Sequence, residues 1–154
     1  RSLLELARSL MPDIVITTDI IVGFPGETAE DFEDTMRMVE RVRYDAMFTF
    51  IFSPREGTPA AKMPDDTPRS EKLERFDRLL ELANRISAEK HAEYLGKTVR
   101  VLVDGESGDE LFPLTSRTKG GRLVHLRGGR ELIGRFIDVR ITDARTWALF
   151  GEQA

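Results

Sequence analysis

The sequence contains no cysteine and only two histidines. Without thiols this chain cannot form a disulfide, use a thiolate nucleophile or ligate an iron–sulfur cluster. His91 and His125 each lie far from any partner at metal-ligand spacing, so we expect no metal site in the chain.

Long apolar runs are also missing. The longest, residues 14–24, is interrupted by Thr17, Thr18 and Asp19, and it falls short of the ~20 apolar residues that a membrane span needs. A composition of 40% apolar and 32% charged residues is typical of a globular protein. We therefore expect a cytoplasmic protein without a membrane partner. Because residues 1–5 lack an initiator methionine and resemble the second half of an amphipathic helix, we also expect the numbering to begin inside a longer protein.

The charge is divided unevenly along the chain. Residues 1–95 hold 13 Lys/Arg against 19 Asp/Glu, whereas residues 96–154 hold 10 against 8. Residues 111–130 contain no acid and five basic residues. Such a block suggests a surface that faces a polyanion, although a solvated loop region of mixed charge is the ordinary alternative.

The first half alternates between strand and helix patterns. A β-branched run predicts a buried strand over residues 14–22, followed by a glycine- and proline-rich turn. Thr28 is suited to cap a helix, and residues 46–52 return to a strand, so the region predicts a βαβ unit. A longer helix is predicted over residues 69–94, ended by Gly96, with an apolar face formed by Leu73, Phe76, Leu80, Ala83 and Ile86.

The second half changes to the two-residue period of strands. Short β stretches are predicted over residues 98–103, 122–126, 133–141 and 146–150, separated by glycines. About five short strands in this length are typical of a small closed barrel of the OB-like kind. The predicted fold is thus a partial α/β region, with about two strands of an incomplete β/α barrel, followed by a small all-β barrel.

Two loops at the ends of the predicted parallel strands are candidates for a ligand site, because ligands bind at the carboxyl edge of such sheets. In the first, Gly23 allows close approach of a ligand and Glu27 could accept a hydrogen bond; the alternative is a turn that only connects strand to helix. In the second, Arg55 is suited to an anion, unless it is simply paired with Glu56. We expect Phe48, Phe50 and Phe52 to lie in the core.

A third candidate spans residues 115–125, where small residues alternate with cations. This pattern suits contacts to phosphate and sugar edges of RNA. His125 could stack on a base, although a lone histidine in a strand is more often an ordinary half-exposed residue.

Residues 17–28, 30–32 and 48–61 resemble the closing part of the radical-SAM domain of methylthiotransferases. Residues 96–103, 117–126 and 134–152 resemble their TRAM domain, a small RNA-binding barrel. The resemblance implies three parts: residues 1–68 as the end of the radical-SAM domain, 69–95 as a linking helix and 96–154 as the TRAM barrel.

The family resemblance implies an enzyme that uses S-adenosylmethionine and two [4Fe–4S] clusters, whose cysteines would all lie upstream of residue 1. This chain would then hold no catalytic residue and be inactive alone. The resemblance points to a cofactor-binding set, Asp19, Ile21, Gly23, Glu27, Ser53 and Arg55. It also points to an RNA-binding set, Arg117, Lys119, Arg122, His125 and Arg127.

Among the branches of the family, the motifs are most similar to the one that modifies isopentenylated adenosine beside the tRNA anticodon. The branches that modify threonylcarbamoyl-adenosine or a ribosomal-protein aspartate remain alternatives, as does a non-catalytic RNA-binding module. Position 121, where tRNA-directed relatives often carry asparagine, is glycine. We also expect the exposed edge of the strand at 14–22 to favour a non-physiological dimer or strand exchange.

Overall fold

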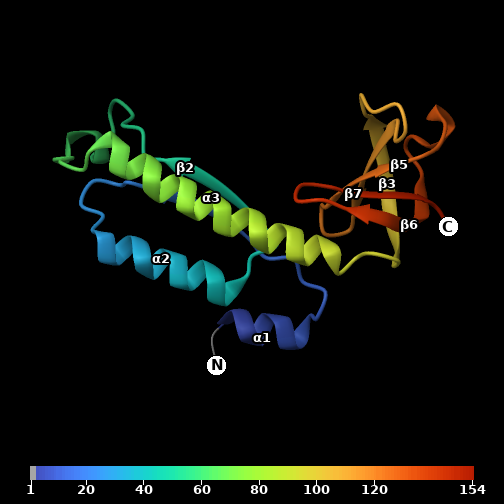
Figure 1. The fold of residues 1–154 in the computed structure, drawn as a ribbon, viewed down its shortest axis with the longest axis horizontal. Coiled ribbons are helices and arrows are strands. Elements are labelled where there is room, and N and C mark those ends of the chain that lie inside the picture. Colours follow the sequence, from blue (N-terminus) through green and yellow to red (C-terminus); the bar gives the residue numbers. More distant parts are fainter. Residues whose placement is uncertain (1–2) are drawn as a thin grey trace. The chain divides into compact units, whose positions relative to one another are not determined.

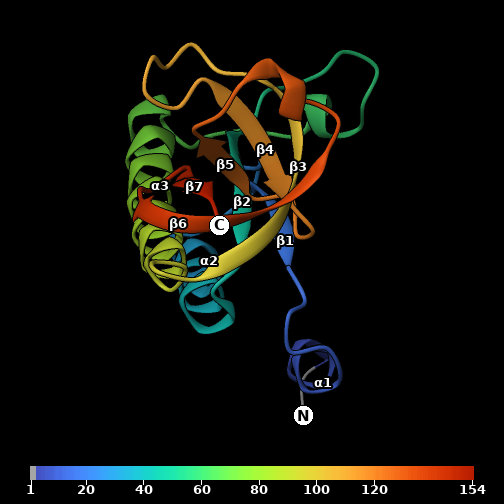
Figure 2. The same cartoon turned by 90° about the vertical axis from the view of Figure 1, so that its right-hand side faces the viewer.

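The computed structural model describes residues 3–154 and divides the chain into two compact units, Arg1–Ile86 and Ser87–Ala154. Figure 1 and Figure 2 together label the helices α1–α3 and the strands β1–β7. The first unit contains, in order, α1 (Leu3–Leu10), β1 (Thr17–Val22), α2 (Ala29–Val42), β2 (Ala46–Ile51), the 3₁₀ turn η1 (Ala60–Lys62) and most of α3 (Arg69–Ala92). The long helix α3 crosses the boundary between the units. No helix among the described residues has the length and apolarity needed to cross a membrane.

The strands β1 and β2 pair in parallel, with Thr17 opposite Ala46 and Val22 opposite Ile51. The predicted strand at 14–22 was therefore three residues too long at its start. Its partner begins only at Ala46, and the chain before it is held differently, by hydrogen bonds that Ile16 and Asp45 exchange. A strand needs a ladder partner, which the β-branched residues before Thr17 lack.

The helix α2 begins where the sequence predicts. Thr28 and Asp31 form a reciprocal capping box, in which each side chain accepts a hydrogen bond from the other residue's backbone N–H. The Thr28 backbone N–H and the Thr28 hydroxyl both donate to the Asp31 carboxylate and lower the pKa of that carboxyl. Phe32 and Val39 of this helix are fully buried.

One face of the β1–β2 sheet forms the core of the first unit. Ile20 and Val22 of β1 pack there with α2 and with Leu79, Leu82 and Ile86 of α3. The predicted apolar face of α3 was partly wrong: Leu73 is 41% exposed. The buried side of the helix instead starts with two charged residues, Lys72 and Arg75, which the sequence pattern alone assigns to solvent.

The second unit is a closed barrel with strand order β3-β4-β5-β7-β6 (Figure 2). All neighbours pair antiparallel except β5 and β7, which are parallel. Every strand contributes at least one branched aliphatic side chain to the interior, and Ser116 of β4 is buried there as well. The strands are β3 (Thr98–Glu106), β4 (Leu114–Thr118), β5 (Leu123–Leu126), β6 (Phe136–Ala144) and β7 (Leu149–Gln153), with a 3₁₀ turn η2 (Arg130–Leu132) before β6.

The predicted fold class is confirmed, with local corrections. The strand β4 lies within a stretch that the sequence marked only as basic, and β6 starts at Phe136 instead of residue 133 because η2 and Gly134 form the preceding turn. The last strand starts at Leu149, so Trp147 lies in a turn and not in a strand as predicted. Gly96 adopts the predicted left-handed conformation, at φ 76°.

Candidate functional site

The face of the β1–β2 sheet opposite the core is open and amphipathic. The register places Asp19 beside Phe48 and Ile21 beside Phe50. Ile21, Phe48 and Phe50 are each more than half exposed. The expectation that the phenylalanines lie in the core was therefore wrong, because α2 and α3 cover only the other face of the sheet.

Charged groups without partners lie on this open face and at its rim. Among residues 3–154, the carboxylate of Asp19 and the guanidinium of Arg55 take part in no hydrogen bond or ion pair. Both residues are exposed. Ser53 is exposed too and follows β2, so it lies at the same carboxyl edge as the turn after β1. The alternative that Arg55 is simply paired with Glu56 is therefore wrong. The Arg55 side chain remains available to an anionic group.

The turn after β1 is built around Glu27. Its Oε1 accepts a hydrogen bond from the backbone N–H of Gly23 at 3.1 Å and one from Arg75 Nη1 at 2.6 Å. Arg75 Nη1 also donates to the Glu27 carbonyl, at 3.1 Å. Only 13% of the Glu27 side chain and 7% of the Arg75 side chain are exposed. The carboxylate that the sequence assigned to a ligand is therefore engaged in shaping the turn.

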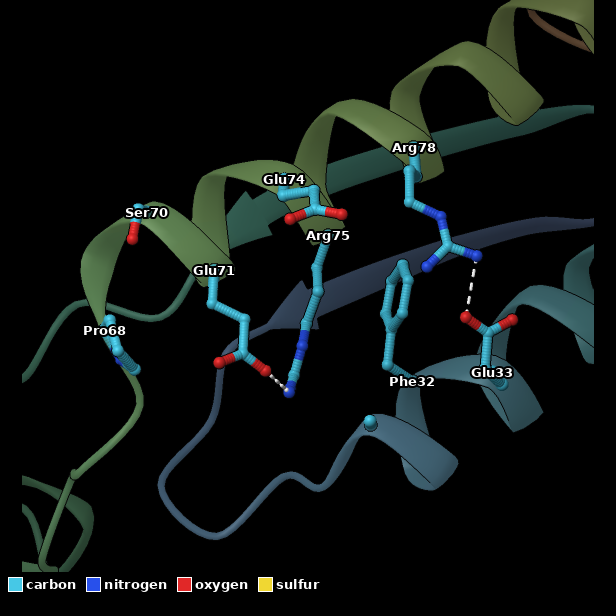
Figure 3. Close-up of a pocket in the computed structure, with 9 residues that line it drawn as sticks. Phe32, Glu33, Pro68, Ser70, Glu71, Glu74, Arg75 and Arg78 are labelled. Atoms are coloured by element: carbon cyan, nitrogen blue, oxygen red, sulfur yellow. Dashed lines mark hydrogen bonds and ion pairs between the residues drawn. The ribbon is translucent and has the colours of Figure 1, made fainter.

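Arg75 is held by two acids, of which Figure 3 draws Glu71. A second ion pair joins it to Glu71, one helical turn earlier. Burial opposes its charge, but the hydrogen bonds to Glu27 and Glu71 outweigh that effect and raise the pKa of Arg75. The guanidinium is also 5.9 Å from the centroid of the Phe32 ring. A cation held this way stays charged and fixes the end of β1 to α3.

A groove of about 470 Å³ separates the start of α2 from α3 beside this network. In Figure 3, Arg78 points across the groove toward Glu33, with which it forms an ion pair of 2.7 Å. Both arginines that line the groove are thus paired with carboxylates. The groove therefore offers a ligand no unpaired cation.

Lys72 stabilises the same edge of the sheet. Its side chain is 9% exposed, forms an ion pair with Asp65 and lies over the ring of Phe52. Phe52 in turn meets Phe24 edge to face, with centroids 5.0 Å apart. This contact joins the two loops that the sequence proposed as a site. Gly23 is required here because an added Cβ would lie 2.7 Å from the methylenes of Lys72.

Lys72 and Arg75 were not predicted from the sequence as residues of this site. Their spacing to Leu79, Leu82 and Ile86 is the three- and four-residue spacing of one helical face, which was the available signal. Of the predicted cofactor set, the structure brings Asp19 and Ile21 onto one face. Gly23 and Glu27 lie in one turn, and Ser53 and Arg55 follow the neighbouring strand.

On the barrel, the predicted basic residues differ in exposure. Arg117 is half exposed and forms a 3.3 Å ion pair with Asp104, which also accepts a hydrogen bond from Thr115. Lys119 lies exposed in the turn between β4 and β5. Arg122 is only 9% exposed, and its guanidinium lies 5.2 Å from the ring of Tyr94. Arg122 therefore packs into the barrel wall, while Arg117 and Lys119 reach solvent.

His125 and Arg127 belong to a group of aromatic and basic side chains on the outside of β5 and β7. His125 stacks on Phe150 with ring centroids 5.1 Å apart and an angle of 17°. Phe112 meets the same Phe150 ring edge to face, and Arg127 lies 5.3 Å from the Phe112 ring. An RNA base was considered as a stacking partner of His125. In the free chain the His125 ring stacks on Phe150.

Arg145 completes this group, with its guanidinium 4.2 Å from the Phe150 centroid. Arg145 was not predicted from the sequence, because a strand was expected to start at residue 146, where the structure has a turn. Among residues 3–154 no group of His, Cys, Asp or Glu side chains is arranged to hold a metal ion.

Known proteins are similar to this chain in both of its units. Residues 92–153 match the TRAM domain family. Over 97% of its length the chain is 53% identical to the tRNA-2-methylthio-N(6)-dimethylallyladenosine synthase of Thermoanaerobacter sp. (strain X514), of which it covers 32%. It is 51% identical to the proteins of the same name from Acetivibrio thermocellus and Bacillus cereus (strain B4264), again over 97% of the chain, covering 31% and 30% of them.

The chain thus spans about a third of the length of the curated relatives it matches. The resemblance suggested by the sequence motifs is confirmed: the chain is similar over nearly its whole length to part of the tRNA-2-methylthio-N(6)-dimethylallyladenosine synthases, and its second unit carries a TRAM domain.

Proposed function

We propose that the chain is part of a cytoplasmic tRNA methylthiotransferase that adds a methylthio group to N6-isopentenyladenosine next to the anticodon. The observation that carries the proposal is the identity of about 50% across both units to synthases named for this product. The first unit contributes part of the cofactor site, and the barrel contributes part of the tRNA-binding surface.

The open sheet face fits S-adenosylmethionine, a ligand with apolar, hydroxyl, amino and carboxylate parts. This cofactor, when bound, supplies the radical and the methyl group of the reaction. The unpartnered Asp19 carboxylate is placed to accept hydrogen bonds from a hydroxyl or amine, and Ile21 offers the adjoining apolar surface. Arg55 and Ser53 at the rim suit a carboxylate. Gly23 and Glu27 act through the shape of the turn.

Iron–sulfur clusters do not fit this chain, because it has no cysteine to ligate them. In our proposal the ligands of both [4Fe–4S] clusters belong to another part of the protein. The chain alone is then inactive in methylthio transfer.

RNA binding is assigned to the outer surface of the barrel. Arg117, Lys119 and Arg127 supply charge for phosphate contacts, and His125 stacks on Phe150 of the neighbouring strand. Arg122 supports this surface from within, through Tyr94.

The proposed function is tested by nucleoside mass spectrometry of tRNA from a strain that lacks the full gene. We expect the 2-methylthio derivative of isopentenyladenosine to disappear and to return when the intact gene is supplied. Unchanged levels would refute the proposal. Loss of a modified threonylcarbamoyl-adenosine or of a modified ribosomal-protein aspartate would indicate another branch, and no loss at all would favour a non-catalytic RNA-binding module.

The site residues are tested in the same strain. The full-length variants Asp19→Asn and Arg55→Gln should each lower the 2-methylthio content about tenfold, as expected for loss of a charged hydrogen bond worth ~1.5 kcal/mol. Asp66→Asn, a change of another exposed carboxylate in the connector before α3, is the matched control and should leave it unchanged. Full modification of tRNA by the Asp19→Asn variant would show that Asp19 is not part of the site.

A further inference from the structure

The turn between β6 and β7 exposes the only tryptophan of the chain. Trp147 is 64% exposed, although burial of an indole ring is among the largest apolar gains available to a folding chain. Trp147 is the largest of the apolar side chains exposed on this unit, which also include Phe136 and Leu111.

The turn that carries Trp147 is fixed by hydrogen bonds to its backbone. The Arg145 N–H donates to the Ala148 carbonyl at 2.9 Å and closes the turn. His91 Nδ1 lies 2.6 Å from the Arg145 carbonyl, and Ser87 donates to the Thr146 carbonyl. A carbonyl only accepts, so His91 carries its proton on Nδ1. The two carbonyls that precede Trp147 in the chain are therefore held from outside the turn.

Cations and flat rings lie beside this turn, and the Phe150 ring at their centre is only 6% exposed. Arg145 lies over Phe150, Phe150 stacks on His125, and Arg127 lies over Phe112, whose ring meets Phe150. The two arginines are exposed. Residues 111–130, which supply much of this surface, contain no acid.

We propose that the β6–β7 turn is a base-stacking site for single-stranded RNA, in which an unpaired nucleobase stacks on Trp147 and the adjoining phosphates contact Arg145 and Arg127. This inference rests on the proposed RNA-binding role of the barrel and gives that role a specific place. Unpaired bases stack on exposed aromatic rings whatever their sequence, and cations beside the ring hold the backbone. Because the turn is already ordered, binding costs little conformational entropy.

Asp143 and Asp109 limit the positive charge of the surface. Asp143 pairs with Arg145 at 2.9 Å, and Asp109 accepts hydrogen bonds from the backbone of its own loop. A phosphate would therefore compete with Asp143 for Arg145. Stacking on Trp147, which needs no charge, supplies the larger share of the affinity at this site.

The fluorescence of Trp147 tests the inference directly, because no other tryptophan contributes. The 154-residue chain is titrated with a short single-stranded oligoadenylate and, separately, with inorganic polyphosphate, which has the charge but no bases. We expect saturable quenching by the oligoadenylate and none by polyphosphate. Equal responses to both probes would overturn base stacking.

Affinity for an end-labelled oligoadenylate provides the second test. Trp147→Ala should weaken binding about 5- to 150-fold, since stacking is worth ~1–3 kcal/mol per base, while Trp147→Phe should keep most of the affinity. Phe136→Ala is the matched control. Phe136 is 63% exposed and lies 5.9 Å from the Arg100 guanidinium, but at the start of β6, away from the turn. Its loss should leave affinity unchanged.

The outcomes separate this inference from the proposed function. If the unchanged chain binds no RNA, the RNA-binding role of the barrel fails. If it binds RNA and Trp147→Ala binds as tightly, only the stacking site is refuted, including the case in which Trp147 serves a protein partner. If Phe136→Ala weakens binding as much as Trp147→Ala, the site is not specific to the turn and the inference is likewise refuted.

Discussion

Arg75 is the residue whose removal should most disturb the end of β1. The change Arg75→Met keeps an unbranched side chain of similar reach on α3 but removes the guanidinium. Glu27 then retains only the N–H of Gly23 as a partner for its largely buried carboxylate. Glu71, which is 45% exposed, can turn to water instead.

The size of the effect follows from this asymmetry. Removing one member of a buried ion pair costs about 3–5 kcal/mol, because the other charge stays buried. We expect a loss of about 3 kcal/mol, the lower end, because Glu27 keeps one hydrogen bond. Glu27→Gln should cost only ~1–2 kcal/mol, since the amide oxygen still serves Gly23 and Arg75 still has Glu71.

The double variant measures the coupling between the two residues. With both charges removed, no charge is left buried, so the total loss should remain near 3 kcal/mol instead of reaching the sum of the single losses. The expected coupling energy is about 1–2 kcal/mol.

Hydrogen exchange measured by mass spectrometry shows which of the two units loses stability in the variant. Amides of β1 and of the start of α2 should exchange on the order of 100-fold faster in Arg75→Met. The midpoint of urea unfolding, followed by the fluorescence of Trp147, measures the stability of the barrel. It serves as the internal control, because Trp147 belongs to the second unit. A single-variant loss below ~1 kcal/mol, or strictly additive losses in the double variant, would contradict the account of Arg75.

Three further predictions concern single features. Burial lowers the pKa of His91 below its ordinary value of 6.5, so the unfolded barrel takes up a proton first as the pH falls: its unfolding free energy should be highest above pH 6.5 and decrease below it. His91→Gln should flatten that dependence in urea titrations, and an unchanged slope would exclude His91 as its source. Gly23→Ala should destabilise the first unit by more than the ~1–2 kcal/mol of left-handed strain, since its Cβ would meet Lys72, while Gly26→Ala, with φ 88° and open space around it, should cost only the strain; equal effects in exchange experiments would refute the clash. β1 (Thr17–Val22) pairs only with β2 among the described residues, so we expect concentration-dependent dimers by light scattering, and a monomer at every concentration would count against strand exchange.

Local signals in the sequence determined much of the fold. The capping pair at Thr28 and Asp31 needs only neighbours in the chain, so it could be predicted without tertiary information. The same holds for Gly96, whose left-handed conformation ends the long helical segment. The two-residue period of the second half predicted a small barrel, because alternation of apolar residues follows from the geometry of a strand.

Partners from distant parts of the chain decided what the local signals could not. The start of β1 depends on where β2 begins, so the residues before Thr17 stay outside the sheet despite their β-branched side chains. Phe48 and Phe50 carry the apolarity of core residues, yet they are exposed because both covering helices lie on the other face.

The sequence by itself determined which chemistry this chain lacks and which residues are available: no cysteine for a cluster, one tryptophan, and an acid-free basic stretch. Only the tertiary structure decided how those residues are used. Glu27 serves the turn instead of a ligand because Arg75, 48 residues later, reaches it from α3. Within residues 3–154 Asp19 has no hydrogen-bond or ion-pair partner, and Trp147 is exposed on a turn held by Ser87 and His91. The reason is physical: a side chain's hydrogen-bond partners and exposure depend on what folds against it, which residue type and local spacing do not specify.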